Sequence, residues 1–112
     1  MDDTSKVSPA VIAAVINPTN EKFASAISVA ELRIKQKIGK LQLPENFDSA
    51  IGESGFDMLA FTSDHAHWLN RLDLHHRDPF DRMLIAQALH EGLTIVTQDR
   101  AFIDYPVPLL IN

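Results

Sequence analysis

Four carboxylates in the sequence are placed where they could hold a cation together. Asp78 and Asp81 open the apolar run "DPFDRMLIAQALHEG", Asp99 follows the run "LTIVT", and Glu31 lies in "SAISVAELRIKQKIGK". Like charges crowded in one place are unfavourable unless protons or cations neutralise them. Oxygen ligands without His or Cys suit Mg²⁺ or Mn²⁺. Such ions polarise a phosphoryl oxygen and generate hydroxide for in-line attack.

The elements that must position these acids can be read from local patterns. Residues 22–28, "KFASAIS", predict a short buried strand, and Ser28 with Glu31 forms the S-x-x-E pattern of a capping box. The helix that this box opens ends at Gly39. Asp78 followed by Pro79 predicts a capped helix that Gly92 terminates, and the β-branched run at 93–97 predicts a strand.

The rest of the chain continues the alternation of strands and helices. We expect helices at 10–16 after a Ser8-Pro9 cap, around 45–53, and at 64–72 after a Ser63 cap, and strands at 56–62 and 108–112, with a turn-rich connection at 98–108. This order predicts an α/β domain with a mostly parallel sheet. Sites in such folds form beyond the carboxyl ends of the strands, so all four carboxylates are expected at one edge.

A purely structural interpretation exists for each acid. Glu31 can complete its capping box, and Asp78 and Asp81 can stabilise the positive end of a helix dipole. Asp99 can be a turn former. Arg82 lies beside these acids and can pair with one of them or steer a substrate. We expect instead that its side chain is an exposed charge on the helix. His75, His76 and Arg77 are expected in a solvated loop, with an RNA phosphate contact as the alternative.

Composition limits the class of protein. The 112 residues fit one domain, and the absence of Cys excludes disulfides and thiolate metal sites. No apolar run is long enough to span a bilayer, and "MDDTSKVSPA" is unlike a secretory signal, so we expect a cytoplasmic protein. The net charge of -5 argues against a broad basic face for nucleic acid. It does not exclude a nuclease whose acidic site holds metal.

The run "HHRDPFDRMLIAQALHEGLTIVTQDRAF", together with "SAISVAELRIKQKIGKLQLP", resembles PIN-domain proteins, and in particular the VapC-type toxins of toxin–antitoxin pairs. The resemblance spans nearly the whole chain. It implies a parallel sheet flanked by helices, Mg²⁺- or Mn²⁺-dependent cleavage of RNA, and neutralisation by a cognate antitoxin. It implies that Glu31, Asp81 and Asp99 are metal ligands and catalytic residues, with Asp78 as an additional acid.

One departure from the family matters. Its members begin with an apolar strand that ends in an aspartate, whereas this chain begins at "MDDTSKVSPAV", which corresponds to a later segment. The sequence therefore predicts a single PIN-like domain over residues 1–112, truncated at its N-terminus and lacking the first strand. Asp2 and Asp3 do not replace the missing ligand.

Three structural outcomes would fill the space left between the neighbouring strands by the missing first strand. The strands at 22–28 and 93–97 would close up and pair directly, a second copy would fill the space in a dimer by strand exchange, or a separate peptide would add a strand. The metal site would also lose a ligand, which would weaken or abolish nuclease activity in an endoribonuclease of this kind. The alternatives for function are a catalytically inactive PIN-like binding or oligomerisation module and a fragment with a mis-assigned start.

Overall fold

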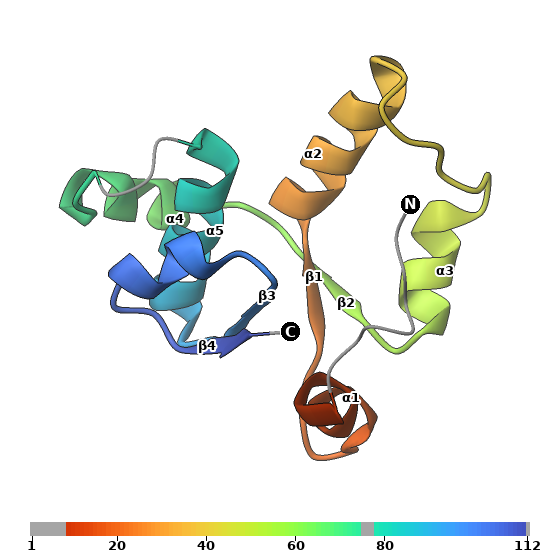
Figure 1. The fold of residues 1–112 in the computed structure, drawn as a ribbon, viewed down its shortest axis with the longest axis horizontal. Coiled ribbons are helices and arrows are strands. Elements are labelled where there is room, and N and C mark those ends of the chain that lie inside the picture. The colour runs from red at the N-terminus through yellow and green to blue at the C-terminus, as the bar shows by residue number, and fades with distance from the viewer. Residues whose placement is uncertain (1–8, 75–77, 112) are drawn as a thin grey trace.

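The structure is a computed structural model, and it describes residues 9–74 and 78–111. Strands and helices alternate along the chain, as the sequence predicts (Figure 1). The strands are β1 (Phe23–Ser25), β2 (Asp57–Leu59), β3 (Ile95–Thr97) and β4 (Leu109–Ile111). The helices are α1 (Pro9–Ile16), α2 (Ala26–Lys37), α3 (Phe47–Glu53), α4 (Ser63–His67) and α5 (Pro79–Glu91), with 3₁₀ turns η2 (Trp68–Arg71) and η3 (Arg100–Asp104).

The strands form two small parallel sheets. β1 pairs with β2, with Phe23 opposite Asp57, and β3 pairs with β4, with Ile95 opposite Leu109. The predicted α/β class with parallel pairing and flanking helices is therefore confirmed. The expected single sheet is not formed by the described residues, because β1 and β3 belong to different sheets. Direct closure of these two strands, one of the three expected outcomes, does not occur in this structure.

The hydrophobic core lies in the C-terminal half of the molecule. Ile85 and Ala88 of α5 pack with Phe102, Tyr105 and Val107, all less than a tenth exposed. The apolar face of α5 thus covers β3, β4 and the turns between them. This half holds most of the buried apolar side chains among the described residues, with Val11 and Ile27 as the two others.

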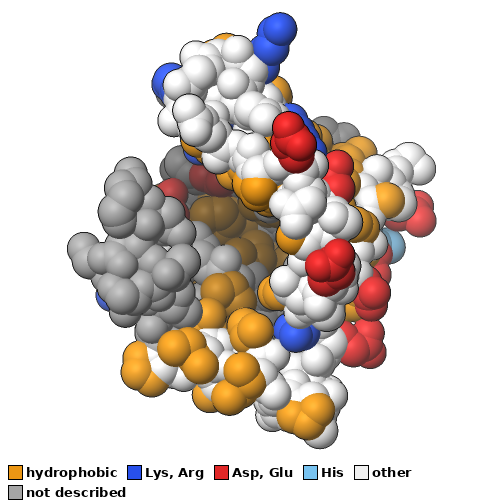
Figure 2. All heavy atoms as spheres, turned by 90° about the vertical axis from the view of Figure 1, so that its right-hand side faces the viewer, with side chains coloured by type: hydrophobic (Ala, Val, Ile, Leu, Met, Phe, Trp, Pro, Cys, Tyr) orange, Lys and Arg blue, Asp and Glu red, His pale blue; other side chains and the backbone are white. Residues whose placement is uncertain are grey.

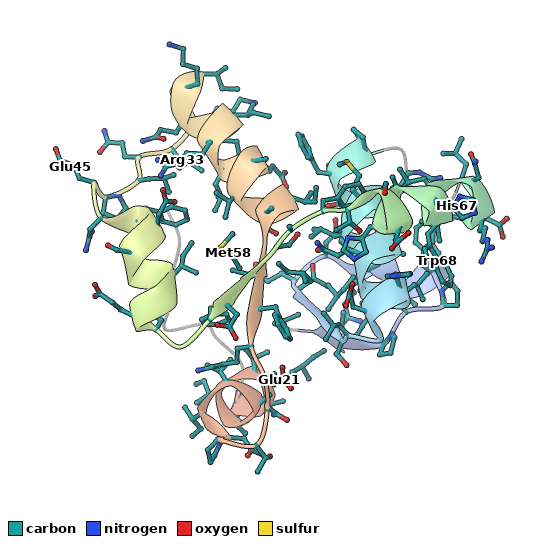
Figure 3. The ribbon with its side chains drawn as sticks, turned by 180° about the vertical axis from the view of Figure 1, so that it is seen from behind. Glu21, Arg33, Glu45, Met58, His67 and Trp68 are labelled. Atoms are coloured by element: carbon teal, nitrogen blue, oxygen red, sulfur yellow. The ribbon has the colours of Figure 1, made fainter. Side chains whose placement is uncertain are left out.

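The N-terminal half instead surrounds an open apolar hollow. It has a volume of about 360 Å³, and Figure 2 shows hydrophobic side chains at its floor. Its lining comes from β1, α2, α3 and the start of the β2 segment: Ala24, Leu32, Phe47, Ala50, Ile51, Ser54 and Phe56. Met58 of β2 is 53% exposed and points toward the space between α2 and α3 (Figure 3).

Helix α5 begins and ends where the sequence predicts. Asp78 is the N-cap, and its Oδ1 accepts hydrogen bonds from the N–H groups of Phe80 (2.9 Å) and Asp81 (3.4 Å). Pro79 occupies the first turn, where its missing N–H has no intrahelical partner to lose. Gly92 ends the helix in the left-handed conformation, with φ 70°.

The predicted start of α2 is wrong by three residues. Strand β1 ends at Ser25, and the Ser25 side chain caps the helix by accepting from the N–H of Ile27 (3.1 Å). Ser28 lies inside the first turn, so the Ser28–Glu31 capping box does not form. The physical reason is that β2 offers only three residues as a pairing partner, and the chain turns into a helix as soon as that pairing ends.

A further boundary differs from the prediction. Thr62, not Ser63, caps α4, in a reciprocal capping box with His65. The connection after β3 contains η3, which Asp99 caps. The predicted cap Ser8 lies outside the described residues. Among the described residues, no helix is long and apolar enough to cross a bilayer.

Candidate functional site

One groove brings together two of the four predicted acids. Glu31 from α2 and Asp78 from the start of α5 line a depression of about 560 Å³. Its other lining residues are two Lys side chains and an apolar set: Ile34, Lys35, Ile38, Lys40, Pro79 and Phe80. The groove therefore joins segments that lie far apart in sequence and carries both signs of charge on an apolar wall.

Glu31 lies in the second turn of α2, not in its first turn as the sequence suggests. Its Oε2 lies 3.3 Å from Nζ of Lys35, one turn further along the helix, and its side chain is 26% exposed. The absence of the capping box removes the structural interpretation of Glu31. What remains is an i,i+4 ion pair, which is worth only a few tenths of a kcal/mol. The position of Glu31 is therefore not required for helix stability.

Asp78 and Asp81 are both half-buried at the mouth of α5. Asp78 uses Oδ1 as the N-cap, so its structural role is confirmed, and it still contributes to the wall of the groove. Asp81 lies in the first turn of α5, where a negative charge favours the positive end of the helix dipole.

Asp99 lies two residues beyond β3, on the exposed surface. Its Oδ1 accepts a hydrogen bond from the N–H of Ala101 (2.9 Å), and its own N–H donates to Oγ1 of Thr97 (3.0 Å). The expected turn-forming role is therefore present. Its position after the carboxyl end of a parallel strand also matches the expected edge for a site.

The four acids do not form a metal site as they stand. Across residues 9–74 and 78–111, no three Asp, Glu or His side chains are arranged so that they could hold a metal ion. The chemistry of the set suits Mg²⁺ or Mn²⁺, but the arrangement does not fit one. The assignment of Glu31, Asp81 and Asp99 as metal ligands therefore stays a prediction. His75, His76 and Arg77 lie outside the described residues.

The expected exposed charge at Arg82 is wrong, because its guanidinium is a structural tie. It donates to the main-chain carbonyls of Asp73 (2.9 Å), Leu69 (3.3 Å) and Leu72 (3.3 Å). It also donates to the hydroxyl of Tyr105 (3.1 Å). With these four partners, the guanidinium fixes the segment before α5 onto the C-terminal core. Its Nη1 and Nη2 groups are therefore already engaged and do not offer a bidentate contact to a substrate phosphate.

Two buried polar side chains escaped the sequence analysis. Gln87 is 2% exposed, and its amide donates to the carbonyls of Leu59 and Ala60, which ties the end of β2 to α5. His65 is 1% exposed, and its Nε2 lies 2.7 Å from Oε2 of Glu91. A polar residue inside the otherwise apolar "LIAQA" run was the available signal for Gln87.

The family model for the PIN domain matches residues 2–108. The chain therefore belongs to the PIN domain family, whose members are generally metal-dependent nucleases that bind Mg²⁺ or Mn²⁺. A search of curated proteins and a search of solved structures each found no match.

Proposed function

We propose that this protein is an endoribonuclease of the VapC toxin type, served by Mg²⁺ or Mn²⁺ and neutralised by an antitoxin. The family match over residues 2–108 carries this proposal. The groove supports it, because Glu31 and Asp78 stand there beside Lys35 and Lys40. Two cations next to two carboxylates suit a phosphodiester backbone that approaches an acidic centre, since the Lys groups offset repulsion of the phosphates.

Each acid has an assigned part in this proposal. Glu31, Asp81 and Asp99 are the proposed metal ligands, and Asp78 is an additional acid that holds the helix start in place. A divalent ion held by these residues would supply Lewis-acid chemistry at a phosphoryl oxygen. The protein residues hold the ligand oxygens and position the RNA. We place this activity in the cytoplasm.

A specific observation favours a second candidate function. The described residues contain no group of three His, Asp or Glu side chains that could hold a metal ion. The second candidate is therefore a catalytically inactive PIN-like binding or oligomerisation module. Metal binding separates the two functions.

The test is a titration of the protein with Mn²⁺ in which calorimetry measures binding of the ion. An active site predicts saturable binding that is lost in the double variant Asp81→Asn, Asp99→Asn. Asp104→Asn is the matched control, because Asp104 is an exposed acid on η3 close to Asp99 in sequence, and it should leave binding unchanged. Binding that survives in the double variant, or no binding at all, would remove the proposed ligand set.

Cleavage is tested with end-labelled single-stranded and hairpin RNA oligonucleotides. The proposal predicts that the wild-type chain cuts RNA with Mn²⁺ and that EDTA stops cleavage. Cleavage that proceeds equally well in EDTA would contradict the metal mechanism. Intact RNA with a well-folded protein would favour the inactive binding module.

A further inference from the structure

The segment that carries α4 and η2 is anchored to α5 at both of its ends. Before α4, the side-chain amide of Gln87 donates to the carbonyls of Leu59 (3.3 Å) and Ala60 (3.2 Å). In η2, the guanidinium of Arg82 donates to the carbonyl of Leu69 (3.3 Å). An amide does not titrate and a guanidinium stays protonated in proteins, so these two anchors do not depend on pH.

Between these anchors, two imidazoles connect the segment to α5. His65 of α4 accepts at Nδ1 from the N–H of Thr62 (3.0 Å), and its Nε2 lies 2.7 Å from Oε2 of Glu91. His90 of α5 accepts at Nδ1 from the indole N–H of Trp68 (3.0 Å), the first residue of η2 (Figure 3). The two imidazole rings lie edge to face, with their centres 5.3 Å apart. The middle of the segment therefore depends on the lone pairs of two titratable rings.

The hydrogen bond between Trp68 and His90 exists in only one charge state of the imidazole. An indole nitrogen can only donate, whereas a protonated imidazole donates from both nitrogens and accepts at neither. The bond therefore requires that Nδ1 of His90 carries no proton. Once Trp68 has left His90, this nitrogen can take up a proton that the closed arrangement excludes. Acid therefore favours the open arrangement, because it binds more protons.

Exposure distinguishes His90 from His65 as the group that responds to acid. His90 is exposed, whereas His65 is 1% exposed, so of the two rings His90 meets solvent protons directly. The Nε2–H that His65 directs at Glu91 is present in the neutral and in the charged ring alike. Protonation therefore does not break the contact between His65 and Glu91, but it does break the one between His90 and Trp68.

The charged groups around this pair do not stabilise a protonated His90 in the closed arrangement. The guanidinium of Arg71 lies 5.2 Å from the centre of the Trp68 ring and places a positive charge on the η2 side. The carboxylate of Glu91 on α5 pairs with His65. Two further titratable side chains of α4 form no ion pair or hydrogen bond with His90 in the described part of the chain: Asp64 and His67. A proton on His90 would thus add a second cation near Trp68, and like charges repel.

We propose that His90 and Trp68 form a proton-sensitive latch between α5 and η2. In acid, His90 releases the indole, and the chain around Trp68 moves away from α5. Gln87 and Arg82 keep the two ends of the segment in place, so the change is local and leaves the hydrophobic core intact. The latch does not rest on the proposed ribonuclease function, because neither of its residues is a proposed metal ligand.

The test measures how accessible the single tryptophan is to acrylamide, which quenches its fluorescence. Quenching is compared at about pH 8 and about pH 5.5, an interval in which histidine is the side chain that ordinarily changes charge. We expect the quenching constant of the wild-type protein to rise about twofold or more in acid, because local opening exposes the indole. The far-UV circular dichroism should be the same at both pH values, because the helices remain folded.

Three variants isolate the charge on His90. His90→Gln keeps an acceptor for the indole N–H but cannot titrate, so its quenching constant should stay at the low wild-type value of pH 8 under both conditions. His90→Lys has only donors and is charged at both pH values, so its quenching constant should be high under both conditions. His67→Gln is the matched control, because His67 is an exposed histidine next to Trp68 in sequence, and this variant should keep the acid response.

Three results would overturn the proposal. Equal quenching of the wild-type protein at both pH values would show that Trp68 stays in place when His90 is charged. An acid response that persists in His90→Gln would assign the sensor to another group, with His65 as the first candidate. A loss of helical circular dichroism in step with the rise in quenching would show that acid unfolds the protein and does not open a local latch.

Discussion

At the scale of single residues, Arg82 is the side chain near the acids with the largest expected effect on stability. Arg82 satisfies the carbonyls of Leu69, Leu72 and Asp73 and the hydroxyl of Tyr105. Arg82→Met keeps the apolar stem but leaves these acceptors without a donor. Unpaired acceptors in partly buried positions each cost about 1–3 kcal/mol, and partial hydration reduces this, so we expect a loss of about 2 kcal/mol.

Urea denaturation monitored by circular dichroism measures this loss as a lower urea concentration at the midpoint of unfolding. Arg100→Met is the matched control, because Arg100 is exposed and no hydrogen bond from its side chain is found in the described part of the chain. A midpoint that is unchanged in the Arg82→Met protein would show that the guanidinium is a solvated charge after all.

His65 ties two helices through both ring nitrogens. Nδ1 accepts from the N–H of Thr62 (3.0 Å), so in the neutral ring Nε2 carries the proton that faces Glu91. Replacement by Phe removes the reciprocal capping box and the link to α5, and we expect a loss of about 1–3 kcal/mol. Glu91→Gln retains an acceptor for Nε2–H and should lose less. Thermal unfolding of the two variants should therefore give clearly separated midpoints.

Local residue roles were predictable to the extent that their partners were local. Asp78 and Gly92 were assigned correctly, because a cap acts on groups within the same few residues. Gln87 and Arg82 were missed or misjudged. Their partners lie on other segments, so no spacing within the chain indicates that these side chains face inward.

At the scale of elements, the end of α5 depends on one glycine conformation. Gly92 has φ 70°, which an L-residue with a side chain adopts only with strain. We expect Gly92→Ala to destabilise the protein by about 1 kcal/mol. The matched change Gly52→Ala lies inside α3, where nothing approaches the added methyl group within 4 Å, and it should stabilise by about 0.5–1 kcal/mol. A lower urea midpoint for Gly92→Ala and a higher one for Gly52→Ala would check both predictions.

Element boundaries were less predictable than element types. Every predicted strand exists within the described residues, but each spans only three residues. Strand length is set by how far a partner runs alongside, and that partner is distant in sequence. Ser25 and Ser28 are both suitable caps, and the end of the β1–β2 pairing decided between them.

At the scale of the whole molecule, the arrangement of strands was the part that sequence patterns could not give. The periodicity predicted parallel strands but not that they would form two sheets. The proposed metal ligands depend on this arrangement, because Glu31 follows one sheet and Asp99 follows the other. The carboxylates could be chosen by residue type and by element, whereas their positions relative to one another depend on how the strands are arranged in sheets.

The uneven distribution of the core predicts uneven stability. Most buried apolar residues lie around α5, while the N-terminal half keeps an open hollow and exposed apolar side chains such as Ile34 and Met58. Regions with few buried contacts unfold locally at a lower free energy than the core. We therefore expect α1 and α3 to unfold before α5 as urea is added.

Trp68 is the single tryptophan, and its Nε1 donates to Nδ1 of His90 on α5, so its fluorescence reports on the C-terminal half. The expected result is that the fluorescence transition lies at higher urea than the loss of total helix measured by circular dichroism. Coincident transitions would show that the two halves unfold as a single cooperative unit.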